Sequence, residues 1–182
     1  MPVIHSQFKP AWWLSNPHAQ TLWPKLFHCK SNLELQWQRV ELNDGDFIDL
    51  VWSGPKQGRV ILLLHGLEGS SNSTYVTRLM QELAQRGMRS CLMHFRGCSD
   101  EVNRLATSYH SGKTEDPQQI LEYLNDQMGI ELYGAIGVSL GGNLLLKWLG
   151  EQGAASPLKR AAVVSVPFLL EETARRMNQG FS

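Results

Sequence analysis

The chain has 182 residues, with 17 basic and 17 acidic side chains, so its formal net charge is zero when the histidines are neutral. No block of like charge stands out along the sequence, which argues against nucleic acid or an acidic membrane surface as a partner. A chain of this length can form one domain with a sizeable core, in which roughly 70% of the unfolded surface is buried.

The cysteine content and the N-terminal residues bear on the cellular location of the protein. Three cysteines, Cys29, Cys91 and Cys98, are odd in number and fit neither a disulfide framework nor the paired spacing of a zinc site. We expect reduced thiols in a cytoplasm. Residues 1–6 lack the basic start and long apolar core of a signal peptide, and no apolar run approaches the length of a membrane span. We therefore expect a soluble cytoplasmic protein without a transmembrane segment.

Residues 1–32 are predicted to form an N-terminal arm, followed by the main domain at residues 33–182. The arm is rich in tryptophan and proline and has no clear helical or strand period. Because exposed aromatic patches are avoided, we expect it to pack over the domain rather than to act as a substrate lid. His18 within the arm is interpreted as a hydrogen-bonded structural residue.

The main domain is predicted to open with an antiparallel hairpin. Residues 33–42 and 46–53 are strand candidates, and Asn43-Asp44-Gly45 between them is a strong turn signal. After the hairpin, apolar runs typical of strands buried on both faces alternate with helical patterns. The predicted strands are residues 59–64, 88–95, 132–138 and 159–166, and the predicted helices end near residues 86, 128 and 149. This alternation indicates an α/β fold with a mostly parallel sheet and right-handed crossovers.

Glycine, aspartate and proline mark the predicted helix ends. Gly87 stops the first helix, and Gly150 takes the C-cap position of the last. Asp116 is interpreted as the N-cap of the middle helix, with Pro117 in its first turn and Gln119 as the capping partner.

A serine between two glycines joins the strand at residues 132–138 to the helix that follows it. Gly137-Val138-Ser139-Leu140-Gly141 has the pattern of a nucleophile elbow. In such a turn a Cβ at Gly137 or Gly141 would collide with the facing chain, and Ser139 is held in a strained conformation with its hydroxyl exposed. The start of a helix adds a favourable dipole for developing negative charge. The alternative is an ordinary glycine-rich turn with an incidental serine.

The loops that follow the predicted parallel strands are expected to build the site. Parallel sheets bind their ligands at the carboxyl ends of the strands, so the loops after Leu64, Phe95 and Val138 should share one edge. Acyl transfer needs two backbone amides directed at the oxyanion, one from the residue after the nucleophile and one from the loop after the third strand. Leu140 and Leu67 occupy those positions. The alternative is that the loop around Leu67 merely ends a strand with a turn.

Five blocks of sequence resemble one known family. They are Asn16-Pro17-His18-Ala19-Gln20-Thr21-Leu22, His65-Gly66-Leu67-Glu68-Gly69-Ser70, Phe95-Arg96-Gly97-Cys98-Ser99, Tyr109-His110-Ser111-Gly112 and Gly137-Val138-Ser139-Leu140-Gly141-Gly142-Asn143. With these blocks the chain is similar, over essentially its whole length, to the YheT-type hydrolases, family four of the AB hydrolase superfamily. The resemblance implies an α/β-hydrolase fold and a Ser/Asp/His charge relay without metal or cofactor. It also implies esterase or acylglycerol-lipase chemistry on small acyl-ester substrates, with Ser139 as the nucleophile.

The same resemblance places the triad acid and histidine after the nucleophile. All six histidines of this chain precede Ser139, so we expect the sequence to be the first half of such an enzyme, without the cap, the last strands, the triad acid and its histidine. Loss of the triad histidine lowers turnover by several orders of magnitude, and the isolated chain is expected to be nearly inactive. The alternative is an inactive fragment or a non-catalytic interaction module that retains the fold.

Other residues of the chain are weak substitutes for the missing base and acid. His65 and His94 lie near strand ends at the expected site edge, but both are interpreted as structural, because a base must reach the nucleophile by hydrogen bonding. The later carboxylates, Glu151, Glu171 and Glu172, are interpreted as solvated helix or loop surface.

Residues 159–166 form a predicted apolar strand that no further strand covers. Unpaired strand edges recruit other chains. We expect the chain to self-associate through this edge or to bind a complementary C-terminal chain.

Overall fold

The computed structural model describes residues 5–26 and 32–179 of the 182-residue chain. His28 and Cys29 lie outside the described residues. The chain divides into two compact units, Met1–Asn32 and Leu33–Ser182, each with its own internal contacts.

The first unit contains a helix, α1 (Pro17–Leu26), that the sequence pattern did not predict. Asn16 caps this helix, because its side-chain Oδ1 accepts a hydrogen bond from the backbone N–H of His18 at 2.9 Å. Asparagine followed by proline at the first helical position is a known helix start, and it forms the helix despite the weak apolar period. The rings of Trp13 and Trp23 pack edge to face, with their centroids 4.9 Å apart.

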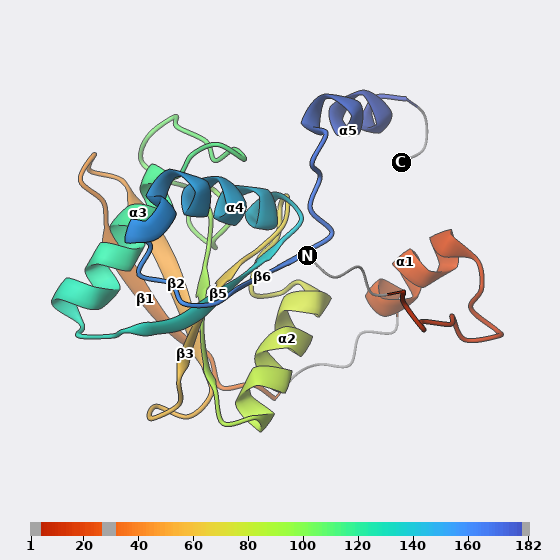
Figure 1. Ribbon diagram of the computed structural model, residues 1–182, viewed down its shortest axis with the longest axis horizontal. Coiled ribbons are helices and arrows are strands. Elements are labelled where there is room, and N and C mark those ends of the chain that lie inside the picture. The colour runs from red at the N-terminus through yellow and green to blue at the C-terminus, as the bar shows by residue number, and fades with distance from the viewer. Residues whose placement is uncertain (1–4, 27–31, 180–182) are drawn as a thin grey trace. The chain divides into compact units, whose positions relative to one another are not determined.

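Six strands among the described residues form one sheet in the second unit, in the order β1-β2-β4-β3-β5-β6 (Figure 1). They are β1 (Gln36–Glu41), β2 (Phe47–Ser53), β3 (Val60–Leu64), β4 (Arg89–Met93), β5 (Leu132–Val138) and β6 (Ala161–Val164). β2 runs antiparallel to β1 and β4, whereas β3 is parallel to β4 and β5, and β5 is parallel to β6. The predicted α/β fold, with a mostly parallel sheet opened by an antiparallel hairpin, is confirmed.

The hairpin turn has the predicted position. The backbone N–H of Leu42 donates to the carbonyl oxygen of Asp46 at 2.8 Å, and the N–H of Gly45 donates to the carbonyl oxygen of Leu42 at 3.0 Å. Gly45 has a φ of 85°, a left-handed conformation that glycine adopts without steric cost. The turn signal in Asn43-Asp44-Gly45 therefore has a direct conformational basis.

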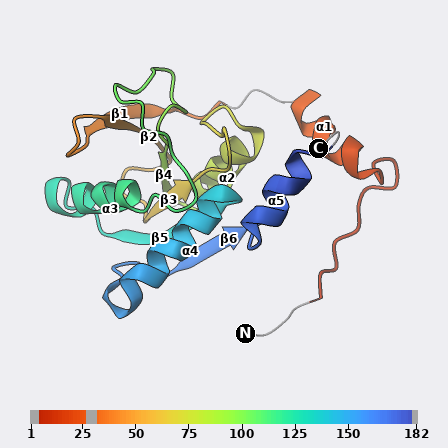
Figure 2. The ribbon, with the colours of Figure 1, turned by 90° about the horizontal axis from the view of Figure 1, so that it is seen from above.

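Helices cover both faces of the sheet (Figures 1 and 2). They are α2 (Thr74–Gln85), α3 (Glu115–Glu122) with its π-helical continuation η1 (Tyr123–Gln127), and α4 (Leu140–Gln152) with the 3-10 turn η2 (Gly153–Ala155). A further helix, α5 (Leu170–Met177), follows β6 and has no buried residue. α2 lies on one face, and α3 and α4 lie on the other, where α4 runs along β5 and β6.

Side chains of the central strands alternate between two cores. In β3, Leu62 packs in the core that includes Trp148 of α4, whereas its neighbour Leu63 packs in the core that includes Met80 of α2. Successive residues of a strand point to opposite faces. Because both faces are buried, β3 is apolar throughout and shows no alternation with polar residues.

The predicted start of the middle helix is wrong. α3 begins at Glu115, and its N-cap residue is Thr114. The carboxylate of Asp116 accepts two hydrogen bonds from Arg96, at 2.7 and 2.8 Å. Gln119 does not complete a capping box, since its Oε1 accepts a backbone N–H of the hairpin turn at 2.9 Å. Tertiary partners have replaced the local cap that the sequence pattern indicated.

The other two predicted helix ends have different outcomes. Gly87 follows α2 with a φ of 69°, so the predicted stop is confirmed. α4 continues through Gly150 to Gln152, and Gly153 adopts the positive φ of 53° at the C-cap. The prediction for Gly150 is therefore wrong by three residues, because a glycine within a helix lowers helix stability without ending the helix.

A buried ion network fastens the loop after β4 to the hairpin turn and to α3. The side chain of Arg96 is 1% exposed, and its Nη1 lies 2.7 Å from Asp44 Oδ2 and 3.0 Å from Asp46 Oδ2. Burial acts to raise the pKa of both aspartates, but their hydrogen bonds and the Arg96 charge outweigh it and hold each pKa below its usual value. With the Asp116 pair included, Arg96 meets three carboxylates, as a buried charge requires.

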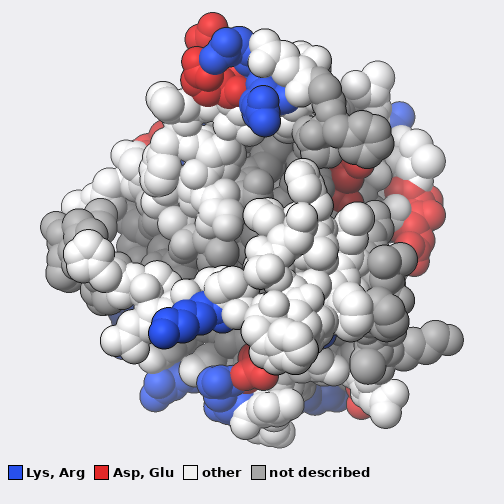
Figure 3. All heavy atoms as spheres, turned by 90° about the vertical axis from the view of Figure 1, so that its right-hand side faces the viewer, with Lys and Arg blue, Asp and Glu red and all other residues white. Residues whose placement is uncertain are grey.

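The surface has no strongly charged region on the face shown in Figure 3, where basic and acidic side chains form small separate groups and much of the area is uncharged. No helix among the described residues has the length and apolar character needed to cross a bilayer. Cys91 is buried and Cys98 is half-buried, and both are free thiols.

Candidate active site

Ser139 lies at the junction between β5 and α4. Its φ of 51° and ψ of −117° form a left-handed conformation that costs a non-glycine residue about 1–3 kcal/mol. Its backbone N–H donates to the carbonyl oxygen of Val164 in β6 at 2.8 Å, and its own carbonyl oxygen accepts the N–H of Asn143 at 3.0 Å. The predicted strained turn is confirmed, and hydrogen bonds on both sides hold it.

The glycines of this turn are needed because two backbones meet there. A Cβ added to Gly137 would lie 2.6 Å from the carbonyl oxygen of Gly141, and a Cβ added to Gly141 would lie 2.4 Å from the carbonyl oxygen of His65. Both distances are far below a normal contact between carbon and oxygen. The steric role predicted for these glycines is confirmed.

The loop after β3 lies beside Ser139. A Cβ built on Gly66 would be 3.3 Å from the Cβ of Ser139. In the described chain the amide nitrogen of Leu67, the next residue, makes no hydrogen bond, and the residue is 53% exposed. Leu140 is the first residue of α4, where an N–H group has no carbonyl partner within its own helix. Both predicted oxyanion donors therefore lie on segments that flank Ser139.

His65 is a structural residue of this loop. Its Nε2 accepts the backbone N–H of Phe95 at 3.0 Å, so the proton of the neutral ring is on Nδ1, which donates to the carbonyl oxygen of Gly66 at 2.7 Å. Burial lowers the pKa of His65 to about 4. With both ring nitrogens bound to backbone, His65 has no free nitrogen to serve as a base for Ser139.

His94, which follows the neighbouring strand β4, is bound in the same way. Its Nε2 accepts the N–H of Ser71 at 3.0 Å, and its Nδ1 donates to the carbonyl oxygen of Asp49 at 3.3 Å. Its ring stacks on Trp37, with an interplanar angle of 7°, and burial lowers its pKa. The structural interpretation of His65 and His94 is confirmed.

The remaining candidates for acid and base are engaged elsewhere. The Nδ1 of His110 accepts the backbone N–H of Gly112 at 3.1 Å. Glu151 pairs with Lys147 on the exposed side of α4. Glu171 and Glu172 lie in α5, which has no buried residue, so their predicted surface position is confirmed. The described residues contain no cluster of His, Cys, Asp and Glu that could hold a metal ion.

Two tyrosines bind the loop after β3, and the sequence pattern did not predict either contact. The hydroxyl of Tyr75, in the first turn of α2, accepts the N–H of Gly66 at 2.8 Å. The hydroxyl of Tyr109 accepts the N–H of Glu68, also at 2.8 Å. Tyr109 belongs to one of the five sequence blocks, and this was the one signal that could have directed attention to it.

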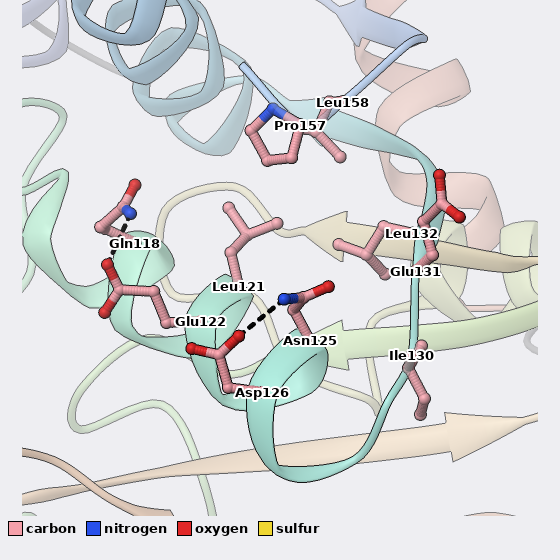
Figure 4. Close-up of a pocket in the computed structure, with 10 residues that line it drawn as sticks. All are labelled: Gln118, Leu121, Glu122, Asn125, Asp126, Ile130, Glu131, Leu132, Pro157 and Leu158. Atoms are coloured by element: carbon pink, nitrogen blue, oxygen red, sulfur yellow. Dashed lines mark hydrogen bonds between the residues drawn. The ribbon is translucent and has the colours of Figure 1, made fainter. Parts of the chain in front are cut away.

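A pocket of about 190 Å³ lies at the end of β5 away from Ser139. Figure 4 shows the residues that line it. It is formed by α3, η1, the segment entering β5 and the segment before β6, and its lining includes Leu121, Leu132 and Leu158. Leu132 is the first residue of β5, whereas Ser139 follows the last. At about 3.3 Å per residue the two ends of β5 are roughly 20 Å apart, so this pocket is separate from the candidate active site.

Strand order, the strained serine after β5 and the loop after β3 together fit one family. Residues 59–182 match the family described as alpha/beta hydrolase fold. The chain belongs to the α/β-hydrolase family. The fold expected from the five sequence blocks is thus confirmed independently of them.

Two curated relatives of this α/β hydrolase extend the comparison. It is 44% identical over 181 residues to the Escherichia coli K12 protein named "Putative esterase YheT", covering 97% of this chain and 53% of that protein. It is 28% identical over 174 residues to Phospholipase ABHD3 of Bos taurus, covering 91% of this chain and 42% of that protein. The predicted YheT resemblance is confirmed, and the chain spans about half the length of these relatives.

Solved structures show the same fold. The Pyrococcus furiosus esterase Pf2001 aligns with a TM-score of 0.67 and 20% identity, over 87% of this chain and 60% of that one. The naproxen esterase of Bacillus subtilis aligns with a TM-score of 0.56 and 22% identity, over 83% of this chain and 52% of that one.

Proposed function

We propose that this α/β hydrolase carries the nucleophile and oxyanion half of a serine-esterase site. The observation that carries the proposal is Ser139, held at a φ of 51° beside the loop after β3. A strained serine at a strand-to-helix junction exposes its hydroxyl and places it at the N-terminus of a helix, where negative charge is stabilised.

In the proposed reaction Ser139 Oγ attacks the carbonyl carbon of an ester. The hydroxyl proton passes to a general base, and the carbonyl oxygen becomes an oxyanion that accepts hydrogen bonds from the N–H groups of Leu67 and Leu140. The intermediate collapses with loss of the alcohol, and water then attacks the acyl-serine to release the acid. Each oxyanion donor of this kind contributes about a hundredfold or more in rate.

The general base is proposed to come from polypeptide outside these 182 residues. His65 and His94 each have both ring nitrogens bound to backbone, and neither is available for proton transfer. The chain should then bind and position an ester but turn it over slowly, since removing the histidine of a serine triad costs several orders of magnitude.

The proposed substrates are carboxylic esters, including acyl esters of lipids. Relatives named as an esterase and a phospholipase support this class. The acyl and alcohol groups would lie along the loops that follow β3, β4 and β5, because those loops share the edge of the sheet that holds Ser139.

Exogenous imidazole can test the proposal by supplying the missing base. Purified chain in imidazole buffer is expected to hydrolyse p-nitrophenyl acetate faster than buffer alone, and mass spectrometry is expected to find a fluorophosphonate probe on Ser139. Ser139→Ala should abolish both. Ser165→Ala is the matched control, because Ser165 is also a serine at positive φ, 54°, at the end of a strand. Folded chain that neither labels nor hydrolyses, or a Ser139→Ala variant that retains both activities, would refute the proposal.

A further inference from the structure

The loop Gly66–Gly69 is a tight turn in which three of the four backbone N–H groups are hydrogen-bonded. The N–H of Gly69 donates to the carbonyl oxygen of Gly66 at 3.0 Å, and Glu68, at the third position of the turn, has a φ of 52°. Turns that need a positive φ at this position favour glycine. A glutamate there is strained, so the surrounding contacts must hold the loop in place.

The peptide group between Gly66 and Leu67 is held in one orientation by hydrogen bonds to its carbonyl oxygen. The carbonyl oxygen of Gly66 accepts hydrogen bonds from both His65 Nδ1, at 2.7 Å, and the N–H of Gly69, at 3.0 Å. The N–H of Leu67 belongs to the same planar peptide group and points the opposite way from that carbonyl. Anchoring the Gly66 carbonyl therefore also sets the direction of the Leu67 N–H.

The peptide groups on either side are held by phenolic hydroxyls. Tyr75 accepts the N–H of Gly66 and Tyr109 accepts the N–H of Glu68, each at 2.8 Å. Burial raises the pKa of both tyrosines, so their hydroxyls stay neutral at pH 7. Tyr109 is itself placed by stacking on Phe95, with ring centroids 5.2 Å apart. Of these three consecutive N–H groups, the two outer ones are bound, and that of Leu67 has no partner among the described residues.

We propose that Tyr75 and Tyr109 are positioning residues that hold the Leu67 amide as the free oxyanion donor. The inference rests on the proposed function of Ser139. The two hydroxyls occupy the neighbouring amides and prevent the turn from rotating, so that one N–H faces the reacting carbonyl. This gives the Tyr109-His110-Ser111-Gly112 block a role, because it carries a side chain from a distant loop to the oxyanion donor.

The conservative variants Tyr75→Phe and Tyr109→Phe keep each ring and remove only the hydroxyl. Tyr123→Phe is the matched control: its hydroxyl accepts a hydrogen bond from Nε2 of Gln38 at 2.9 Å. The residue lies in η1 and lines a hollow that includes no residue of the Gly66–Gly69 loop. Each of the three substitutions removes a tyrosine hydroxyl that accepts a hydrogen bond. A difference between the variants therefore reports the position of the lost bond rather than a general loss of stability.

The first measurement is amide hydrogen exchange, monitored residue by residue by NMR on the full 182-residue chain. In the unmodified chain the amides of Gly66 and Glu68 should exchange slowly and the amide of Leu67 quickly. Tyr109→Phe should speed exchange at Glu68 by about tenfold or more, and Tyr75→Phe should do the same at Gly66, as expected when a protecting hydrogen bond opens. A slowly exchanging Leu67 amide, or unchanged exchange at Gly66 and Glu68 in these variants, would overturn the inference.

The second measurement is imidazole-assisted hydrolysis of p-nitrophenyl acetate. Losing an oxyanion donor costs about 10²–10³ in kcat, and loosening one should cost about tenfold. We expect that loss in kcat for Tyr75→Phe and Tyr109→Phe with KM unchanged, and no loss for Tyr123→Phe. An equal loss in the control, or a change in KM alone, would overturn the inference. If the proposed function is wrong, the Ser139→Ala variant will instead hydrolyse the ester as fast as the unmodified chain. The hydrogen-exchange measurement then still tests whether the two tyrosines hold the amides of Gly66 and Glu68.

Discussion

The Cα of Gly141 faces the carbonyl oxygen of His65 so closely that a Cβ on Gly141 would lie 2.4 Å from that oxygen. This contact joins the first turn of α4 to the end of β3. It brings the loop that contains Leu67 next to Ser139. It also leaves no room for a side chain on Gly141.

Gly141→Ala should therefore be strongly destabilising. The added methyl group meets two backbone carbonyl oxygens, those of His65 and Leu64, at 2.4 and 2.5 Å, and a clash with backbone is relieved only by moving strand or helix. We expect a loss of about 1–3 kcal/mol or more in the free energy of unfolding, measured by urea denaturation.

Gly150→Ala is the matched control for this substitution in the same helix. A Cβ at Gly150 meets nothing within 4 Å, and alanine is favoured over glycine inside a helix by about 0.5–1 kcal/mol. This variant should be slightly more stable than the unmodified chain. Similar stabilities for the two variants would show that the close approach at Gly141 is not tight.

Arg96→Met should also destabilise the fold. The substitution leaves the buried carboxylates of Asp46 and Asp116 without their cation, and breaking a buried pair typically costs about 3–5 kcal/mol. Arg86→Met removes an exposed ion pair with Glu82 and should change the free energy of unfolding by less than about 1 kcal/mol. Equal effects of the two substitutions, in the same urea titration, would contradict a structural role for the network.

Stability should fall as pH drops from 6.5 toward 4. Burial lowers the pKa of folded His65 from 6.5 to about 4, so within that range the unfolded chain binds more protons than the folded one. Each pH unit then costs up to about 1.4 kcal/mol. We expect roughly 1.5 kcal/mol less stability at pH 5 than at pH 6.5 from this residue, and the lowered pKa of His94 acts in the same direction.

His65→Asn offers a check on that pH dependence. Asparagine retains a side-chain N–H donor but has no group that titrates in this range. Urea unfolding of the variant at pH 6.5 and pH 5 should show a smaller difference than in the unmodified chain. A difference of the same size would mean that other groups dominate the dependence.

The edge strand β6 should promote self-association of the isolated chain. β6 is the last strand of the sheet, and exposed apolar side chains continue beyond it, with Val164 50% and Phe168 77% exposed. Unpaired apolar edges pair with other chains, and a lysine at the edge disfavours this. Size-exclusion chromatography with light scattering should find species larger than a monomer.

Val164→Lys should shift that population toward the monomer. Val102→Lys is its matched control, because Val102 is 86% exposed in a loop away from the edge. A monomer in the unmodified chain, or equal effects of the two lysines, would contradict association through β6.

Much of the fold could be predicted because its signals are local. Continuous apolar runs mark strands buried on both faces, and Asn43-Asp44-Gly45 marks a turn that needs a positive φ at its glycine. The serine between Gly137 and Gly141 likewise carries its own steric requirement. Each of these patterns specifies backbone conformation within a few residues, so no distant partner is needed to interpret it.

Helix ends and side-chain partners could not be predicted in the same way. Asp116 is a good N-cap by local rules, yet it binds Arg96, twenty residues earlier in the chain. Conversely, α1 forms where no apolar period is evident, because Asn16 caps it. A local preference of about 1 kcal/mol gives way when a buried charge needs a partner, since an unpaired one costs several times more.

The sequence by itself determined the strands and the three helices that alternate with them along the chain, the strained serine at residue 139 and the family to which the chain belongs. Only the tertiary structure decided which groups are free to act. It showed that both nitrogens of His65 and of His94 are bound to backbone, and that Tyr75 and Tyr109 occupy the amides on either side of Leu67. The physical reason is that a hydrogen bond depends on where two groups lie in space, and here the partners are separated by as many as 45 residues of chain.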